Sequence, residues 1–568
     1  MEQGGINFDE ILLKVGEFGR YQIYIYNILC LFMFVPPWHT LAIYFLSGTA
    51  EHWCKIPEWD SVDCENIGLN STRECILAKR EVGIPSNLSS NGGVIFDQCH
   101  RYNVGDTAFN SSLRFGDDTI IPCDAGWEYD VDYSTSTIDL EFNLVCGASY
   151  LPSVSQSLFF AGGAAGSVVV GFVADRIGRK PTTFICLAIA STSGVIMAFS
   201  INIWMFLIFR TLTGAFIFGV STVSYVFANE FVGPSKRNVS GGFAWVYFSC
   251  GYMCLALLAY FIRKWHHLQL VISLAPLSLF AFYMFLPESV RWLLSQDRSD
   301  EAVEIISKIA HVNKITDPFI AGRSDLNTSS SDRKSEPEEI EQKFTDLLRM
   351  PLLRKYFFNV MFNWIVNTIV YYGLSLSTNT LGVNIYIAFA IAGAVEIPGN
   401  LVVIYPIEYF GRRPSYVFFM LVGGVACLAT IFIPQGPWRI TAAMVGKFAI
   451  TASFNIIFLL ACEIFPTPVR NSALGICRLG SNVSSILCPF ILLLGNIWKP
   501  LPLTVFGTMT LLAGGLAIHL PETRGKKLPE TLEEGENIGW KAQPRNDFQR
   551  APPVAFSELK QDLEDSSE

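Results

Sequence analysis

The sequence predicts an all-α membrane protein of twelve spanning helices, arranged as two similar halves of six helices. Three observations lead to this prediction: a membrane-like composition, twelve apolar runs of spanning length, and charged motifs that repeat at a nearly constant spacing. Of the 568 residues, 51% are hydrophobic and only 16% are charged, against roughly a quarter charged in soluble domains. Backbone groups in lipid must be satisfied internally, so apolar runs of about 20 residues are interpreted as helices.

The apolar runs form two groups separated by a polar linker. In the first half, 21–286, we expect spans at 21–47, 149–173, 182–200, 203–228, 240–262 and 268–286. In the second half, 355–520, we expect spans at 355–376, 383–407, 415–434, 438–461, 472–495 and 502–520. The remaining segments are polar: the N-terminus 1–20, the linker 287–354 and the tail 521–568. The charged, Pro-rich tail is typical of disorder.

The two halves carry the same charged motifs. The motif DRIGRKP at 175–181 returns as EYFGRRP at 408–414, an offset of 233 residues. Glu230 returns as Glu463 at the same offset, and Glu288 returns as Glu522 at 234. Repeated halves of this kind form two bundles with the solute site between them, near the bilayer midplane.

An acidic segment, 48–147, follows the first expected span. It holds six Lys and Arg against seventeen Asp and Glu, a net charge of −11, whereas the whole chain has −9. It carries six cysteines and three glycosylation acceptors, namely Cys54, Cys64, Cys75, Cys99, Cys123 and Cys146, with Asn70, Asn87 and Asn110. These features predict a disulfide-bonded, glycosylated extracellular loop, although six cysteines leave 15 pairings open.

The short loops set the orientation. Those expected on the side of the termini are rich in Lys and Arg, which indicates the cytosolic face. The basic residues are Arg176, Arg179, Lys180, Lys236, Arg237, Arg412, Arg413 and Arg470. Both termini and the linker are therefore expected in the cytosol, and the acidic segment outside.

The repeated charges also suggest a gate. We expect the basic residues of the two motifs to meet carboxylates across the cytosolic face and to bias which side of the molecule is open. The candidate gating residues are Asp175, Arg179, Lys180, Glu230, Glu288, Glu408, Arg412, Arg413, Glu463 and Glu522. The alternative is that these charges set topology only, because each exposed pair contributes only about 0–1 kcal/mol.

Charged groups inside the spans mark candidate solute contacts, because such groups usually face a cavity or a partner. Four stand out, namely Arg210, Glu396, Lys447 and Arg478. Glu396 is positioned to bind an ammonium group, or else to be neutralised internally by Lys447 or Arg478. The candidate aromatic contacts, which attract quaternary ammonium through cation–π interaction, are Trp38, Tyr225, Trp364, Tyr371 and Tyr372. Ordinary packing is the alternative for these aromatics.

Several long motifs resemble the organic cation/anion/carnitine transporter branch of the major facilitator superfamily. They are VGEFGRYQ at 15–22, PESVRWLL at 287–294 and AVEIPG at 394–399, together with the large cysteine-bearing loop. The motifs GNIWKPLP at 495–502 and LPET at 528–531 are similar to invertebrate members. The resemblance covers about 7–540 and implies a plasma-membrane carrier that works by alternating access.

The resemblance also implies site residues. It places Trp364, Tyr371, Tyr225 and Asn455 at cavity positions and gives Glu396 an ammonium-binding role. The chain departs from the pattern at Asn482, where cation carriers have an acid and anion or carnitine carriers have an arginine. Arg478 lies one turn earlier, on the same helix face. Phe218 and Ser221 also stand where cation carriers bear Lys and Trp.

We therefore expect a carrier of small organic cations or zwitterions, such as quaternary ammonium or carnitine-like solutes. An organic anion transporter, a sugar porter and a receptor-like member without transport are the alternatives. The expected partners are the solute and the lipid bilayer; a coupling ion and self-association are both compatible with such a carrier. No phosphate-binding loop, metal-spaced His/Cys set or basic patch occurs, so we expect no enzyme, cofactor, metal or nucleic-acid partner.

Overall fold

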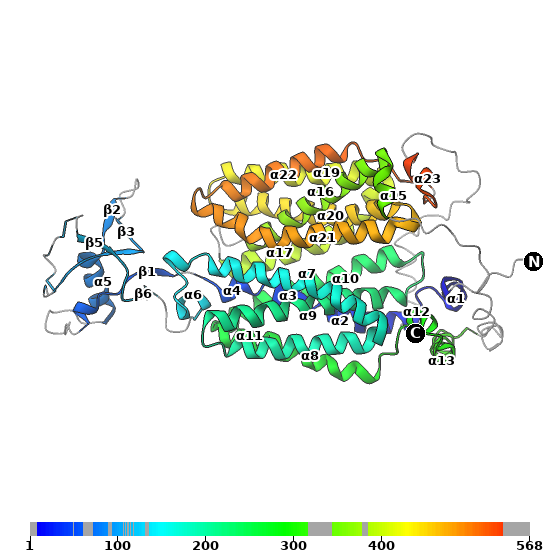
Figure 1. Ribbon diagram of the computed structural model, residues 1–568, viewed down its shortest axis with the longest axis horizontal. Coiled ribbons are helices and arrows are strands. Elements are labelled where there is room, and N and C mark those ends of the chain that lie inside the picture. Colours follow the sequence, from blue (N-terminus) through cyan, green and yellow to red (C-terminus); the bar gives the residue numbers. More distant parts are fainter. Residues whose placement is uncertain are drawn as a thin grey trace, which may run out of the picture.

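The computed structural model describes most of the chain. The described residues are 8–48, 50–60, 72–88, 94–105, 107, 109–110, 113, 115–116, 119–130, 136–315, 344–377, 384–526 and 528–537. Figure 1 shows a long helical bundle with a small mixed α/β domain at one end. We call that end the domain end and the opposite end, which carries α1 (Phe8–Val15), α12 (Val290–Ser295) and α13 (Ser299–Val312), the linker end.

Ten helical stretches within the described residues are long and apolar enough to cross a membrane. Two further helices, α16 (Pro351–Leu376) and α22 (Leu501–Ala517), pack into the same bundle and bring the number of spans to twelve. The other spans are α2–α4 (Arg20–Met33, Pro36–Thr40, Ile43–Leu46), α7 (Leu151–Ile177), α8 (Arg179–Ala198), α9 (Ile203–Glu230), α10 (Arg237–Phe261), α11–η5 (Trp265–Leu274, Ala275–Met284), α17–α18 (Ile385–Val402, Ile404–Tyr409), α19 (Arg412–Phe432), α20 (Pro437–Ile464) and α21 (Thr467–Leu493).

The helices differ from the apolar runs in two ways. The first span, expected to be continuous, is broken at Pro36 and Pro37, because proline supplies no backbone N–H to the helix. Several helices extend about a turn beyond their apolar runs, so that Asp175 and Glu230 belong to the last turns of α7 and α9. Helical hydrogen bonding continues where hydropathy falls, which a reading of hydropathy alone does not detect.

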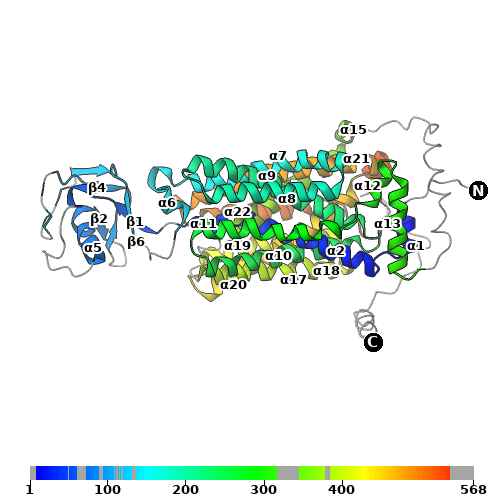
Figure 2. The same ribbon diagram turned by 90° about the horizontal axis from the view of Figure 1, so that it is seen from below.

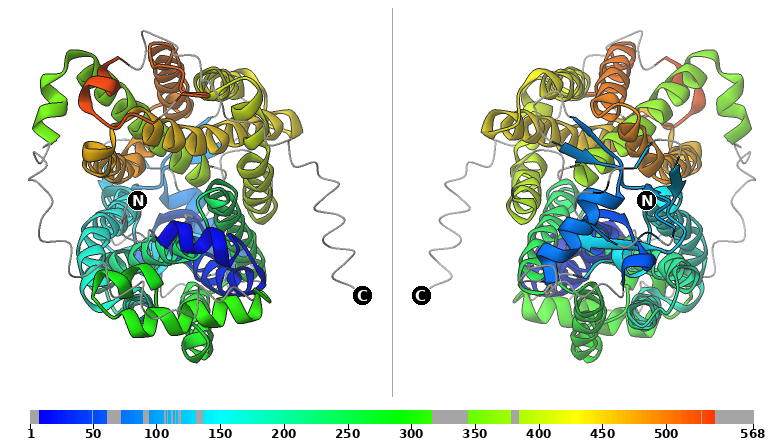
Figure 3. Two further views of the ribbon diagram at one scale, coloured as in Figure 1. Left: turned by 90° about the vertical axis from the view of Figure 1, so that its right-hand side faces the viewer. Right: turned by 90° about the vertical axis from the view of Figure 1, so that its left-hand side faces the viewer.

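The twelve spans form two bundles that lie side by side, α2–η5 in one and α16–α22 in the other (Figures 1 and 3). Two large hydrophobic clusters each belong to a single half. A third cluster is shared, and near the domain end it packs Tyr44 and Phe45 against Phe389 at ring-centroid distances of 4.9 and 4.7 Å. Tyr386 also stacks on Phe45 and meets Tyr260 edge-on. The halves are thus joined by aromatic packing at the domain end.

The acidic segment folds into the small domain at the domain end. Its strands pair antiparallel in three two-stranded sheets, β1 (Glu51–Cys54) with β6 (Trp127–Asp130), β2 (Ser86–Leu88) with β3 (Val94–Phe96), and β4 (His100–Tyr102) with β5 (Ile120–Pro122). Helix α5 (Thr72–Gly83) packs beside them. Arg101 is buried at the centre, where it bonds Glu58 at 3.0 Å and Asp124 at 2.9 Å.

The five described cysteines of this segment are all disulfide-bonded, and the pairings that the sequence left open are given for four of them. Cys54 pairs with Cys123, and Cys99 pairs with Cys146 at the start of the second span. Cys75 is also disulfide-bonded, while Cys64 and the acceptor Asn70 lie outside the described residues. Asn87 and Asn110 have exposed side chains, so both predicted glycosylation sites are accessible.

Arg210 is fully buried in the first half without a carboxylate partner. Its Nη2 donates to Gln156 Oε1 of α7 at 3.0 Å, and the guanidinium lies 4.5 Å from the centre of the Phe159 ring. No Asp or Glu oxygen among the described residues lies within 4.0 Å of Arg210. A buried charge without a counter-charge is costly, so the burial of Arg210 lowers the stability of the folded protein.

Replacing Gln156 with Glu gives up the hydrogen bond that Gln156 Nε2 donates to Thr40 O at 2.9 Å, but it is expected to stabilise the protein on balance, because it supplies the missing counter-charge to a guanidinium that is already desolvated. For a chain of 568 residues, relief of even about 1 kcal/mol would raise Tm by about 1 °C. The measurement is thermal unfolding of the detergent-purified protein. Gln156→Leu is the matched control and should lower Tm, since it removes the only hydrogen bond that the structure gives the guanidinium. A Glu variant that unfolds as early as the Leu variant would contradict this account.

Candidate functional site

A cavity of about 130 Å³ lies between the two halves, with walls from seven helices. The spacing of its lining residues explains how the helices present them: each set recurs at three or four residues, which is one face of an α-helix. The lining residues are Pro36 and Thr40 (α3), Phe218 and Ser221 (α9), Trp245 and Phe248 (α10), Trp364, Thr368, Tyr371 and Tyr372 (α16), Glu396 and Asn400 (α17), Thr451, Phe454, Asn455 and Phe458 (α20), and Arg478, Ser481, Asn482 and Ser485 (α21).

The cavity brings together seven of the ten predicted solute contacts. These are Glu396, Tyr371, Trp364, Asn455, Arg478, Asn482 and Tyr372. The other three lie outside its lining. Trp38 is buried with its Nε1 donating to Gly251 O at 3.1 Å, Tyr225 packs behind Trp245 at 6.2 Å, and Lys447 lies behind Glu396. The surroundings of Trp38 therefore fit ordinary packing, the alternative to solute contact.

Aromatic rings make up much of the wall. Trp364 lies parallel to Phe458 with the ring centroids 6.1 Å apart, and Tyr371 meets Tyr372 edge-on at 5.3 Å. Trp245 meets Phe248 edge-on at 5.6 Å from the opposite half. Such faces attract a cationic or apolar group and contribute about 0.5–2 kcal/mol per cation–π contact.

Sequence reasoning missed the whole wall contributed by the first half, Pro36 included. Thr40, Trp245 and Phe248 were not among the predicted contacts, and Phe218 and Ser221 were noted only as departures from the family pattern. In the second half a signal existed. Thr368 and Ser481 lie one turn from predicted residues, on the same helix faces, and their hydroxyls are hydrogen-bonded to each other.

Glu396 is paired inside the protein. Its Oε1 lies 2.8 Å from the Lys447 ammonium, and its Oε2 accepts a hydrogen bond from Ser249 of the other half at 3.2 Å. Both charged side chains are only 2% exposed. Of the two internal partners proposed from the sequence, Lys447 is the one in contact. The carboxylate therefore lines the cavity with its charge already balanced.

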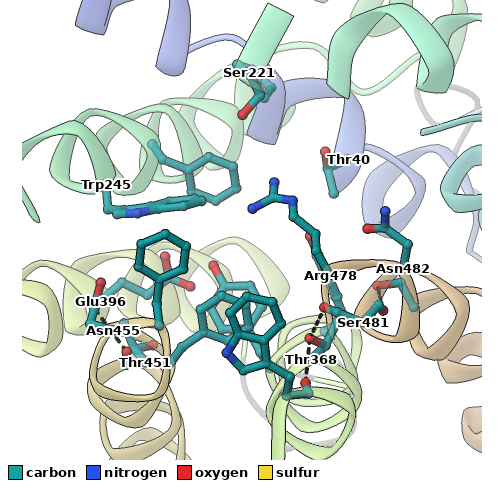
Figure 4. Close-up of a pocket in the computed structure, with 18 of the residues that line it drawn as sticks. Thr40, Ser221, Trp245, Thr368, Glu396, Thr451, Asn455, Arg478, Ser481 and Asn482 are labelled. Carbon is teal, nitrogen blue, oxygen red and sulfur yellow. Dashed lines mark hydrogen bonds between the residues drawn. The ribbon is translucent and has the colours of Figure 1, made fainter. Parts of the chain in front are cut away.

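Arg478 is the cavity's unbalanced charge. Its side chain is exposed to the cavity and, in Figure 4, reaches across it towards the helices that carry Thr40 and Ser221, with Glu396 on the far side. Within the described part of the chain no carboxylate oxygen lies within 4.0 Å of its guanidinium, and no hydrogen bond of that group is found. The geometry thus presents a cation to whatever enters the cavity.

The repeated charged motifs lie at the linker end and form two similar networks. In the first half, Arg179 pairs with Asp175 at 3.0 Å and Glu230 at 3.3 Å. In the second half, Arg412 pairs with Glu463 at 3.2 Å, whereas no ion pair of Glu408 occurs among the described residues. Each network stays within its own half. These partners are among those that the sequence analysis expected at this face, and the described ion pairs between them each lie within one half.

Two carboxylates of these networks cap helices. Glu288 accepts the backbone N–H groups of Arg179 and Lys180 at 3.0 and 3.2 Å, at the start of α8. Glu522 accepts those of Arg412 and Arg413 at 3.0 and 3.1 Å, at the start of α19. Burial raises the pKa of the Glu288 carboxyl, and the N–H groups that it accepts act against that shift. The repeated carboxylate therefore caps the N-terminus of the corresponding helix in each half.

Asp175 and Glu408 form a matched pair for testing the gating role that we propose for these networks. Asp175→Asn removes an exposed ion pair of about 0–1 kcal/mol, so we expect turnover to change by up to about fivefold with normal surface abundance. Glu408→Gln removes a charge with no described partner and should leave turnover nearly unchanged. The measurement is initial uptake rate per surface-labelled molecule. Equal effects of the two variants, or no effect of Asp175→Asn, would leave these charges with a topological role only.

With the fold and cavity described, comparison with known proteins decides the family. Residues 106–534 match the family model described as sugar (and other) transporter. The chain belongs to this major facilitator family. It is 38% identical over 547 residues to the organic cation transporter protein of Drosophila melanogaster, covering 95% of this chain and 96% of that one. It is 34% identical to solute carrier family 22 member 3 of Rattus norvegicus, covering 94% and 96%.

Solved structures agree with the fold. The proton:xylose symporter XylE bound to 6-bromo-6-deoxy-D-glucose superposes with a TM-score of 0.56 at 16% identity, covering 90% of this chain and 98% of that one. At this identity the likeness concerns the major facilitator fold alone. The predicted branch, organic cation/anion/carnitine transporters with invertebrate relatives, is confirmed by the sequence relatives. The chain is a multi-pass membrane transporter and not an enzyme.

Proposed function

We propose that this major facilitator transporter carries small zwitterionic organic solutes, of the betaine or carnitine type, across the plasma membrane. Two relatives from Drosophila melanogaster are named organic cation transporter protein and organic cation transporter-like protein, which supports an organic solute with a positively charged group. The observation that carries the finer proposal is that Arg478 on the cavity wall has no counter-charge among the described residues. A carboxylate on the solute supplies the counter-charge that the protein does not.

The charges around the cavity favour a zwitterion over a free cation. Glu396, Lys447 and Arg478 together give a net charge of +1, with the first two already paired at 2.8 Å. A free cation would add a second unbalanced positive charge near Arg478, and like charges repel each other. A zwitterion places its carboxylate at Arg478 and leaves its onium group to the aromatic faces of Trp245, Trp364 and their neighbours.

The cavity volume sets the scale of the solute. About 130 Å³ is of the order of a protein cavity of ~150 Å³ that holds benzene. Glycine betaine is the zwitterion nearest this size, whereas the longer carnitine, like a bulky aromatic amine, would require the halves to separate.

The structure also suggests which side is closed. Aromatic packing joins the halves at the domain end, whereas the charged networks at the linker end stay within each half. We infer that the domain end faces outward, as its disulfides favour, and that this conformation is closed to the outside. Alternating access then consists of opening the shared aromatic cluster while the halves close at the linker end.

An uptake panel in oocytes tests the proposal. Labelled carnitine and glycine betaine should show saturable uptake, with tetraethylammonium much weaker, and the panel should be repeated without sodium and with the membrane potential clamped. Saturable tetraethylammonium uptake without any zwitterion uptake would overturn the charge assignment. Benzoate is included because the net positive wall also favours an organic anion, which is the second candidate. Strong benzoate uptake without carnitine uptake would favour that candidate.

A further inference from the structure

Lys447 lies in a complete ammonium-binding site built by the protein itself. Its Nζ is 2.8 Å from Glu396 Oε1, 2.5 Å from Ser375 Oγ and 3.4 Å from the backbone oxygen of Tyr371. The same atom lies 3.5 Å from the centre of the Tyr371 ring. A carboxylate, a hydroxyl, a carbonyl and an aromatic face are the groups that bind an organic ammonium ion.

Two of these groups also face the solute. Glu396 and Tyr371 both line the cavity, whereas Lys447 does not. The lysine thus approaches the carboxylate and the ring from behind the wall, and a solute would approach them from in front. Ser249 of the first half holds the other carboxylate oxygen at 3.2 Å, so the carboxylate that would receive a solute's ammonium group also contacts both halves.

We infer that Lys447 is a tethered cation that occupies the onium site of Glu396 and Tyr371 and thereby selects against free organic cations. This inference rests on the proposed function only in taking the cavity as the solute site. A solute cation that paired with Glu396 would leave Lys447 without a counter-charge, because no other carboxylate among the described residues lies within 4.0 Å of its ammonium. Breaking one partner from a buried ion pair lowers binding by the order of 100-fold or more.

A zwitterion avoids this penalty. Its carboxylate binds Arg478, and its onium group rests on the aromatic wall without separating Lys447 from Glu396. The selection therefore depends on the pair remaining closed, and Lys447 acts as a specificity residue rather than a solute contact. Removal of the Lys447 ammonium should change the solute selectivity of the transporter more than its abundance at the cell surface.

Lys447→Met tests the inference because it removes the ammonium charge beside Glu396 while nearly keeping the volume of the side chain. Tetraethylammonium uptake per surface molecule should rise at least about tenfold over the parent, while the ratio of cation to carnitine uptake rises further. Lys447→Met combined with Glu396→Gln should lose that gain, because the carboxylate that receives the cation is gone. Lys499→Met, in the loop before α22, is the matched lysine control and should leave the ratio unchanged.

The outcomes are separable from those of the proposed function. Carnitine uptake by the parent tests the proposed function, and the gain of cation uptake in Lys447→Met tests the tethered cation. If Lys447→Met does not reach the surface, Lys447→Gln keeps a neutral donor beside Glu396 and should show the same gain in smaller measure. Surface-expressed variants without any gain, or an equal gain in the double variant, would overturn the inference.

Discussion

Replacing Arg478 with Met should reduce carnitine uptake at least about 30-fold in kcat/KM with normal surface abundance. The reason is that Arg478 has no protein counter-charge within the described residues, so its whole electrostatic contribution is available to the solute. Truncating one partner of a buried charge pair costs about 2–5 kcal/mol, and the lower bound of that range gives the figure. The measurement is concentration-dependent uptake normalised to surface-labelled protein.

Two further variants separate charge from shape. Arg478→Lys keeps the charge but not the bidentate geometry, so it should retain part of the uptake. Arg478→Met with Asn482→Arg moves the cation one turn along the same face of α21 and should restore carnitine uptake in part, since Asn482 also lines the cavity. Carnitine uptake that survives Arg478→Met unchanged would remove the guanidinium from the solute site.

Much of the fold follows from two patterns in the sequence. Apolar runs predicted the spans, and the repeat of the DRIGRKP motif predicted two halves, because neither depends on which side chains touch across the bundle. The breaks are harder to place. Pro36 and Pro37 were visible in the first apolar run, but a hydropathy pattern does not distinguish a kink from a continuous helix, and the structure divides that span into α2, α3 and α4.

The candidate site was predictable where one helix carries it. Trp364 and Tyr371 are seven residues apart, and Arg478 and Asn482 are four apart, so helical periodicity alone places each pair on one face. Which cation pairs with Glu396 was not predictable, since Lys447 and Arg478 lie on different helices and the sequence holds no distance between them. In the structure Glu396 contacts Lys447 at 2.8 Å. Arg478 is therefore the charge on the cavity wall that has no described counter-charge.

The charged motifs show the same limit. Their identity and spacing predicted networks at one end of the bundle, and such networks are present. Which half supplies each partner was left open, and in this conformation Arg179 and Arg412 pair with carboxylates of their own halves. The sequence pattern predicts which charged residues lie at the same depth in the membrane. Which of them form ion pairs depends on how the two halves are positioned relative to each other.

Replacing Gly166 with Leu should prevent α7 from packing on α9 and should have the largest effect on stability of the changes considered. A Cβ at Gly166 would lie 2.2 Å from the backbone oxygen of Ala215, and one at Gly162 would lie 2.1 Å from that of Thr211. Small residues four apart let membrane helices approach to backbone contact. Because backbone atoms cannot move aside as a flexible side chain does, we expect a loss of at least about 3 kcal/mol.

Gly171 provides the control on the same helix. A Cβ there meets nothing within 4 Å, so Gly171→Leu should fold and reach the surface as the parent does. The measurement is Tm in detergent together with surface abundance. About 3 kcal/mol corresponds to a fall of roughly 2–3 °C in a chain of this length, and Gly166→Ala should already show part of it. Equal Tm values for the Gly166 and Gly171 variants would mean that α7 and α9 are not held at backbone contact. Since α9 supplies Phe218 and Ser221 to the cavity, the close approach of these helices also positions the first half's wall of the solute site.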